Sequence, residues 1–174
     1  MDCAATLNPF YTYYAVRRIS PSFHTEWPYY ALHACTWMGC EMSVNDRDLV
    51  AYVLSRLGCT HPFTISRVAA LAELLSLERR GARITDLRYI KGPGVFFIEG
   101  LKESIEGDPC FKIREGDPST GRRGCIEYRC DPPELPREVA RLIDDAIARA
   151  CGLNDYELNN LIMNHPLFER LVRG

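Results

Sequence analysis

The order of its apolar patterns is the feature that most constrains what this chain can fold into. Apolar residues recur at helical spacing over residues 46–57, 64–80 and 95–105. Apolar and polar residues then alternate over residues 110–114 and 125–130. Helical spacing predicts amphipathic helices, and alternation over such short stretches predicts β-strands. Three helices followed by a two-stranded hairpin is the element order of a winged helix.

Two further helical patterns follow the predicted hairpin. Residues 134–151 are the clearest amphipathic helix of the chain, and residues 155–164 are a shorter one that Asn154 or Asp155 can cap. A last apolar turn surrounds Phe168. We therefore predict an α+β fold that is predominantly helical. It has a winged-helix-like core of three helices plus a β-hairpin, followed by two or three C-terminal helices.

Turn and cap residues set the boundaries of the first elements. Asn45 or Asp46 can cap the first helix, and Thr64 can cap the second, whose apolar residues lie on one stripe. Residues 84–90 are predicted as a short extended segment. The Gly-Pro-Gly sequence of residues 92–94 then breaks the chain before the third helix.

Residues 1–41 differ in composition from the rest of the chain. They hold nine aromatic residues, half of the total, but only five charged residues, and they sustain no periodic pattern. We interpret them as an aromatic-rich N-terminal extension, with Met42 as a candidate native start and residues 42–174 as a single globular domain. The alternative is a native arm that packs its aromatic side chains on the domain or on a partner.

The charge balance argues against a protein that holds nucleic acid mainly through phosphates, because such proteins are usually basic. This chain has 21 Lys and Arg against 23 Asp and Glu, for a net charge of -2. No window of 18 uncharged apolar residues predicts a membrane span, and the amino terminus has no signal-peptide pattern. We therefore expect a cytoplasmic protein that makes no membrane contact.

The segment in the position of a DNA-reading helix is acidic. Residues 99–106 carry three glutamates and one lysine, and phosphates on both sides of the major groove repel carboxylates. Arg122 and Arg123 at the hairpin tip suit a phosphate or a minor groove, with a solvated turn as the alternative. Direct DNA binding is therefore the weaker prediction.

Eight cysteines occur without any CxxC pair, so a zinc ribbon or a thioredoxin-type site has little support. A hairpin centred near residue 120 places Cys110 opposite Cys130 at a separation that suits a disulfide, whereas Cys125 points to the other face. This bridge closes a 21-residue loop and adds roughly 3 kcal/mol. Free thiols remain the alternative, since a cytosolic mesophile keeps its cysteines reduced while a hyperthermophile can pair some.

The sequence contains no pattern that predicts catalysis. It has no GxSxG, HExxH or Walker sequence. His165 follows the last long helix and precedes a proline, and we predict a structural hydrogen bond for it at a helix end. We expect no enzyme activity, no cofactor and no bound metal.

Three ordered motifs resemble a known family. Residues 65–74 followed by Gly-Ala-Arg-Ile-Thr at 81–85 resemble the helix and turn of the Panacea antitoxin-domain (SocA-like) proteins. Lys-Gly-Pro-Gly-Val at 91–95 lies where that family has a Gly-Pro turn. Residues 155–161 and 165–168 resemble its carboxy-terminal helix. The likeness covers roughly residues 45–172 and is that of a remote or divergent member.

The resemblance implies a non-enzymatic, protein-binding regulator of the antitoxin or proteolytic-adaptor kind. Its partner is then another protein, such as a toxin or a regulatory partner, and a homodimer is a further alternative. From their positions we expect Lys91, Arg122 and Arg123 to contact the partner or nucleic acid. The alternative function is a winged-helix DNA-binding transcription regulator that touches DNA through the hairpin. A structural domain of a larger assembly is a third class.

Overall fold

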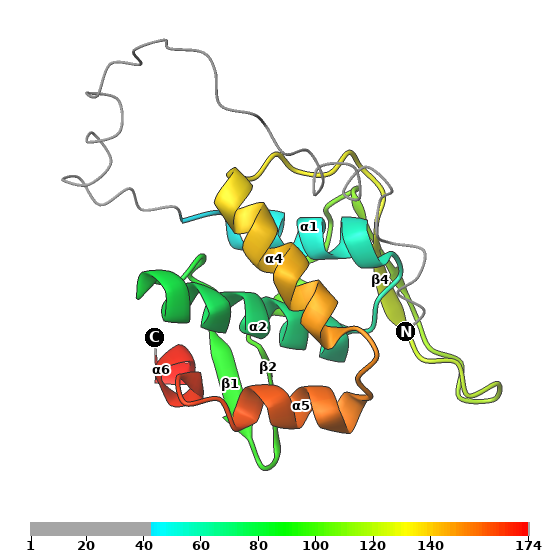
Figure 1. Ribbon diagram of the computed structural model, residues 1–174. Coiled ribbons are helices and arrows are strands. Elements are labelled where there is room, and N and C mark those ends of the chain that lie inside the picture. The colour runs from blue at the N-terminus through cyan, green and yellow to red at the C-terminus, as the bar shows by residue number, and fades with distance from the viewer. Residues whose placement is uncertain (1–42, 174) are drawn as a thin grey trace, which may run out of the picture.

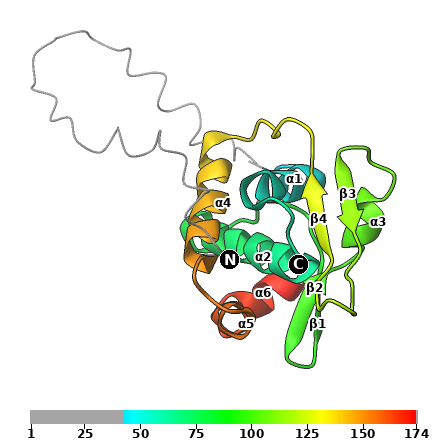
Figure 2. The same cartoon turned by 90° about the vertical axis from the view of Figure 1, so that its right-hand side faces the viewer.

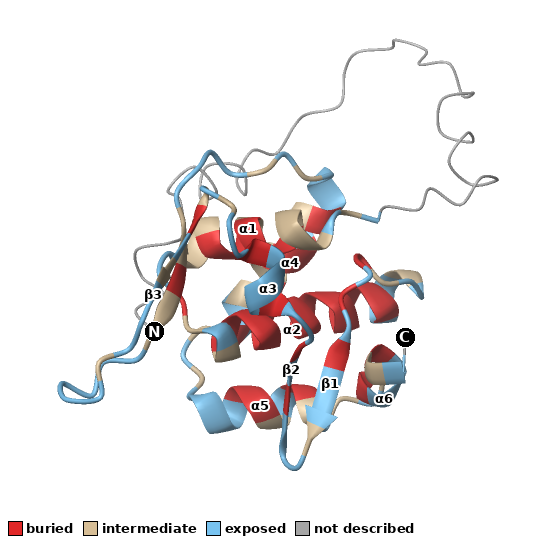
Figure 3. Cartoon of the chain, turned by 180° about the vertical axis from the view of Figure 1, so that it is seen from behind, coloured by how far each residue is buried: buried red, intermediate tan, exposed pale blue. Residues whose placement is uncertain are grey.

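A central helix organises the fold. In the computed structural model, which describes residues 43–173, helix α2 (Pro62–Arg80) is surrounded by the other elements (Figure 1). Every side chain of residues 64–77 is buried, as the colouring of α2 in Figure 3 shows. The predicted apolar stripe of this helix is buried, but the remaining faces are buried as well, which the stripe did not predict. Neighbours pack on all of its sides, so its polar positions are buried along with its apolar ones.

The described residues form six helices and two antiparallel hairpins, which confirms a predominantly helical α+β fold. The elements around α2 are α1 (Asp46–Leu57), β1 (Tyr89–Gly92), β2 (Val95–Ile98), α3 (Leu101–Ile105), β3 (Phe111–Arg114), β4 (Cys125–Tyr128), α4 (Arg137–Ala150), α5 (Asp155–Met163) and α6 (Phe168–Arg173). Figure 2 shows α4 on one side of α2 and both hairpins on the other. Three C-terminal helices follow the second hairpin.

Helix boundaries follow their caps. Helix α1 has its predicted bounds, and the Asn45 side chain accepts a hydrogen bond from the backbone N–H of Arg47. Helix α2 begins two residues earlier than predicted, because His61 and not Thr64 caps it. His61 Nδ1 accepts from the N–H of Phe63 at 3.2 Å. Pro62 is well placed at the first helical position, where it has no N–H to lose.

The predicted third helix over residues 95–105 is wrong in its first half. Residues 95–98 form strand β2, which pairs with β1 in the register Lys91↔Phe96 and Gly92↔Val95. Pro93 and Gly94 make the two-residue turn between them, and Gly94 has a φ of 72°, which favours glycine. The run Val-Phe-Phe-Ile consists of strand-favouring residues, and only five residues of the predicted helix remain, as α3.

The predicted hairpin of residues 110–130 is present as β3 and β4. Phe111 pairs with Tyr128, so the strands are shifted by one residue from the predicted register, which had Cys110 opposite Cys130. The N–H of Arg129 donates to the carbonyl of Cys110. Cys110 and Cys130 nevertheless form a disulfide, because their Cα atoms are 5.2 Å apart.

A second disulfide, which the sequence did not predict, fastens this hairpin to the start of α2. It joins Cys59, before α2, to Cys125 in β4. Next to it, Thr60 and Ile126 exchange two backbone hydrogen bonds of 2.9 Å. The β3–β4 hairpin is therefore held against the amino-terminal end of α2 by covalent and backbone bonds together.

A buried carboxylate fixes the loop that follows α2. Glu73 is fully buried, and its oxygens accept hydrogen bonds from the backbone N–H groups of Ile84 and Thr85 at 2.6 and 3.0 Å. The Thr85 hydroxyl also donates to Glu73, and Arg83 lies 3.8 Å away. These contacts account for the threonine of the Gly-x-x-Ile-Thr sequence, and they close the backbone of the loop around one side chain of α2.

One buried hydroxyl near this loop makes no hydrogen bond. Tyr89 is 4% exposed, and its OH has no partner among the described residues. We expect Tyr89→Phe to raise the free energy of unfolding by about 1 kcal/mol, since an unpaired buried hydroxyl is unfavourable. Thermal unfolding monitored by circular dichroism measures the change. Tyr128→Phe is the control, because its OH donates to the carbonyl of Asp131. A loss of stability in Tyr89→Phe contradicts the prediction.

No helix among the described residues is both long and apolar enough to cross a membrane. The predictions for residues 1–41 and for Met42 lie outside the described residues.

Candidate functional site

A groove of about 790 Å³ lies between the two hairpins, at the amino-terminal end of α2. One wall comes from β2 and the first residues of α3, and the opposite wall comes from the ends of β3 and β4. His61, Phe63 and Arg67 of the α2 region line it between these walls. A groove of this size is in the range that proteins use for ligands. The β1–β2 hairpin lies between α2 and α3 in the chain, so the predicted order of three helices and one hairpin is not observed, and the groove lies between this extra hairpin and the predicted wing, β3–β4.

Two glycines allow the two backbone segments of the β3–β4 hairpin to approach each other closely where the hairpin forms one wall of the groove. Gly116 and Gly124 both line the groove and face each other across the hairpin stem. A Cβ atom on Gly116 would lie 2.8 Å from the backbone nitrogen of Gly124, and one on Gly124 would lie 2.9 Å from the carbonyl oxygen of Arg114. Glycine is required at both positions because the two backbones approach too closely for a side chain.

Exposed apolar side chains gather on the outer face of the β1–β2 hairpin, beside the groove. Ile90, Val95 and Phe97 are 39%, 44% and 48% exposed, and all three line the groove. Side chains alternate along a strand, so Phe96 and Ile98 point into the core while Val95 and Phe97 face outward. We call Ile90, Val95 and Phe97 the apolar face of the hairpin.

Arg67 is a buried cation in the lining of this groove. The residue is 1% exposed, and its guanidinium carbon lies 3.6 Å from the ring centre of Phe63 and 4.2 Å from that of Phe96. One terminal nitrogen donates to Asn159 Oδ1 at 2.7 Å, and the other makes a long contact of 3.4 Å with the carbonyl of Phe63. Its Nε has no hydrogen-bond partner among the described residues.

Desolvation lowers the pKa of Arg67 to about 10, an effect that the charge of Asp155 partly offsets. The guanidinium therefore stays charged at neutral pH. Within the described residues no carboxylate lies within 4 Å of it, and Asp155 itself is ion-paired with Arg123. Two aromatic faces, the Asn159 amide oxygen and the more distant carbonyl of Phe63 stabilise this cation at short range.

Comparison with protein-family models, with curated proteins and with solved structures finds no match to this chain. The Panacea resemblance therefore stays a prediction.

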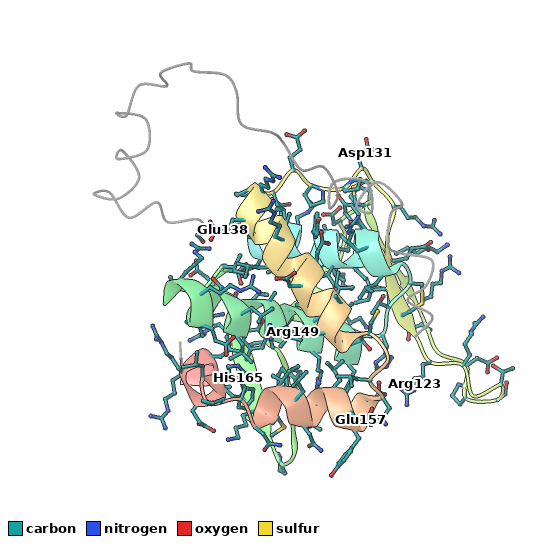
Figure 4. The ribbon with its side chains drawn as sticks, in the orientation of Figure 1. Arg123, Asp131, Glu138, Arg149, Glu157 and His165 are labelled. Carbon is teal, nitrogen blue, oxygen red and sulfur yellow. A yellow bond between two sulfur atoms is a disulfide. The ribbon has the colours of Figure 1, made fainter. Side chains whose placement is uncertain are left out.

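The three contact residues predicted from the sequence do not line the groove. Lys91 is on β1, where it pairs with Glu169 of α6, holds the pKa of that carboxyl below its usual range and lies over the ring of Phe168. Arg123 pairs with Asp155 at the start of α5, and Figure 4 labels Arg123 beside this end of the helix. Arg122 is exposed at the hairpin tip, where its backbone bridges to Asp117.

His165 lies between α5 and α6 (Figure 4). Its Nδ1 accepts a hydrogen bond from the N–H of Leu167 at 3.2 Å, and its Nε2 is 3.1 Å from an oxygen of Glu78. The bond from Leu167 is local to the start of α6, and the contact with Glu78 connects this segment to α2.

Sequence reasoning missed Arg67 and the apolar face of the hairpin. A signal for Arg67 was available, since it is a lone positive charge in the uncharged stretch that runs from Pro62 to Ala72. The apolar face had a weaker signal, the Pro-Gly pair between two runs of strand-favouring residues. Assigning those runs to a helix hid the alternation that exposes Val95 and Phe97.

Proposed function

We propose that this protein is a non-enzymatic regulator that binds another protein, of the antitoxin or proteolytic-adaptor kind. The supporting observation is the apolar face of the hairpin, which lies open beside a groove instead of in the core. Exposed apolar surface next to a concave site is typical of protein-binding surfaces. We assign the groove to an extended segment of the partner.

The strand edge favours an extended segment. Strand β2 pairs only with β1 among the described elements. Unpaired strand edges recruit extended peptides, whose alternate side chains fit pockets on the neighbouring surface. Val95 and Phe97, two residues apart on β2, supply apolar contacts at that spacing.

The alternative of a DNA-binding regulator has no comparable support. The helix that would enter a major groove is α3, which has five residues and exposes one lysine and one glutamate, Lys102 and Glu103. Such a short helix offers few side chains to base edges, and Glu103 is repelled by phosphates.

The predicted cytoplasmic location is part of this proposal. Disulfides persist in oxidising compartments and, as an exception, inside hyperthermophiles. A cytoplasmic location together with the two disulfides of residues 43–173 is therefore consistent with a hyperthermophilic source.

The protein-binding proposal is tested by peptide selection. A displayed library of random dodecamers is panned on the immobilised full chain, and the enriched peptides are synthesised with acetylated and amidated ends. We expect Val95→Ser to weaken their binding about tenfold, because burying a valine contributes roughly 1.5 kcal/mol. Fluorescence polarisation with labelled peptides measures the affinity.

Leu161→Ser is the matched control, because Leu161 on α5 is 43% exposed, close to the 44% of Val95, and does not line the groove. It should leave the affinity unchanged. The proposal fails if no peptide is enriched, or if the enriched peptides bind Val95→Ser as well as the wild type. It also fails if sedimentation shows a homodimer that Val95→Ser dissociates, since the groove would then serve self-association.

A further inference from the structure

The groove contains a positive charge that the described residues leave without an anion. Arg67 has an Nε–H with no acceptor and a guanidinium with no carboxylate within ion-pair distance in residues 43–173. A buried charge without a counter-charge is unfavourable, and aromatic faces supply no acceptor for the N–H. Such a group is a candidate for binding an anion.

The other charges that line the groove do not serve this purpose. Glu99 lies 3.6 Å from Arg88 and Arg114 pairs with Glu127, while Lys102 and Glu103 on α3 and Glu115 after β3 are exposed. Water and salt screen such exposed charges, whereas a buried guanidinium is screened much less. Among residues 43–173, the buried charge in the groove lining that lacks a counter-charge is therefore that of Arg67.

We propose that the segment bound in this groove carries an aspartate or glutamate whose carboxylate pairs with Arg67, while its neighbouring apolar residues pack on the apolar face of the hairpin. This inference rests on the proposed function and adds the chemistry of the partner. The partner motif is acidic and apolar together, because the groove places one cation and one exposed apolar surface side by side.

Phe63 controls access to the guanidinium. Its ring covers one face of Arg67, is itself half-buried and lines the groove. Because Arg67 is 1% exposed, its pairing with a carboxylate of the segment requires a change of the Phe63 rotamer that uncovers the guanidinium. Helix α2 also starts here, so its positive end adds to the attraction for a carboxylate.

The test uses the acetylated, amidated peptides selected above, so that chain-end carboxylates do not contribute. Each aspartate or glutamate is replaced by asparagine or glutamine, and dissociation constants are measured by fluorescence polarisation. We expect one such replacement to weaken binding to the wild-type chain about tenfold or more, since a charge-assisted hydrogen bond is lost. The difference in affinity between the acidic peptide and its amide version should vanish in Arg67→Met. Methionine is chosen because its side chain fits between the two aromatic rings.

Arg79→Met is the matched control, because Arg79 is also an arginine of α2 but pairs with Asp145 outside the groove, and it should keep the preference for the acidic peptide. If Arg67→Met does not fold, NMR of a peptide with a ¹³C-labelled carboxylate replaces it. In the complex with wild type, the pKa of that carboxylate should fall below its value in the free peptide.

The outcomes separate this inference from the proposed function. If binding depends on Val95 but the asparagine or glutamine versions of the peptides bind as tightly as the acidic ones, the carboxylate pairing is overturned and the protein-binding proposal stands. An acid preference that Arg67→Met leaves intact, or a carboxylate pKa that does not fall, also overturns the pairing. Absence of any Val95-dependent peptide overturns both. N-acetylaspartate methylamide that binds as tightly as the peptide overturns the peptide assignment in favour of a small acid.

Discussion

Glu73→Ala is expected to lower the free energy of unfolding by about 3–5 kcal/mol, because it leaves two buried N–H groups and a hydroxyl without their acceptor. A domain is usually stable by about 5–15 kcal/mol in total, so this is a large fraction. Denaturant unfolding of the oxidised chain, followed by circular dichroism, measures the change.

Glu78→Ala is the matched control on the same helix. Glu78 is 45% exposed and pairs with His165 at the surface. Exposed pairs of this kind contribute about 0–1 kcal/mol. If the two alanine variants lose the same stability, Glu73 does not hold the loop of residues 83–85 in the way described.

The same carboxylate gives a pH dependence. Burial raises the pKa of Glu73 above its ordinary value of 4.5, and the hydrogen bonds from Thr85 and Ile84 offset only part of that effect. The native state therefore holds this proton more tightly than the unfolded state, and the contribution of Glu73 to stability falls as pH rises from 4.5 through the native pKa.

Glu73→Gln removes this titration. The free energy of unfolding of wild type, minus that of Glu73→Gln, should therefore fall as pH rises across that window and stay constant above it. Urea unfolding at several values between about pH 4 and pH 8 measures the difference. If wild type instead gains stability relative to Glu73→Gln as pH rises, the native pKa of Glu73 is lowered and not raised.

Removing the disulfide between Cys59 and Cys125 is expected to lower the free energy of unfolding by about 4 kcal/mol, because the bridge spans 66 residues and constrains the unfolded chain strongly. The double variant Cys59→Ser/Cys125→Ser is compared with the oxidised wild type by denaturant unfolding. It also removes the covalent link between the β3–β4 hairpin and the start of α2 and leaves only the backbone bonds of Thr60 and Ile126, so binding of the selected peptides should weaken.

Cys110→Ser/Cys130→Ser is the comparison, because its bridge spans only 20 residues. We expect a smaller loss of about 3 kcal/mol for this variant. Under denaturing, non-reducing conditions, at most three of the eight cysteines should react with a thiol reagent, since Cys59, Cys110, Cys125, Cys130 and Cys151 are disulfide-bonded. Eight reactive thiols would refute both bridges.

Local sequence signals were enough for the elements that carry their own pattern. Helix α1 could be placed from Asn45 and its apolar face, and α5 from the capping box of Asn154 and Glu157. Helix α4 shows a strong separation of polar and apolar faces, so its position was predictable within a few residues. The β3–β4 hairpin and its Cys110–Cys130 bridge followed from alternation and spacing.

The β1–β2 hairpin and the groove needed the tertiary structure. The run Val-Phe-Phe-Ile is short and apolar, and such runs fit a helix or a strand equally well until a partner strand is known. The groove is formed by residues from segments far apart in the chain, so no local pattern announces it. Lys91 and Arg123 were chosen for their exposed positions, but the fold uses both in ion pairs.

The sequence by itself determined the helical α+β class, the order of most elements and one covalent bridge, because caps, periodicity and spacing act between near neighbours along the chain. Only the tertiary structure decided that α2 is buried on all sides, that β2 is a strand and that Arg67 meets two aromatic rings but no carboxylate of residues 43–173. Each of these depends on which distant residues pack together. Burial and electrostatic cost are properties of that packing and not of the local sequence.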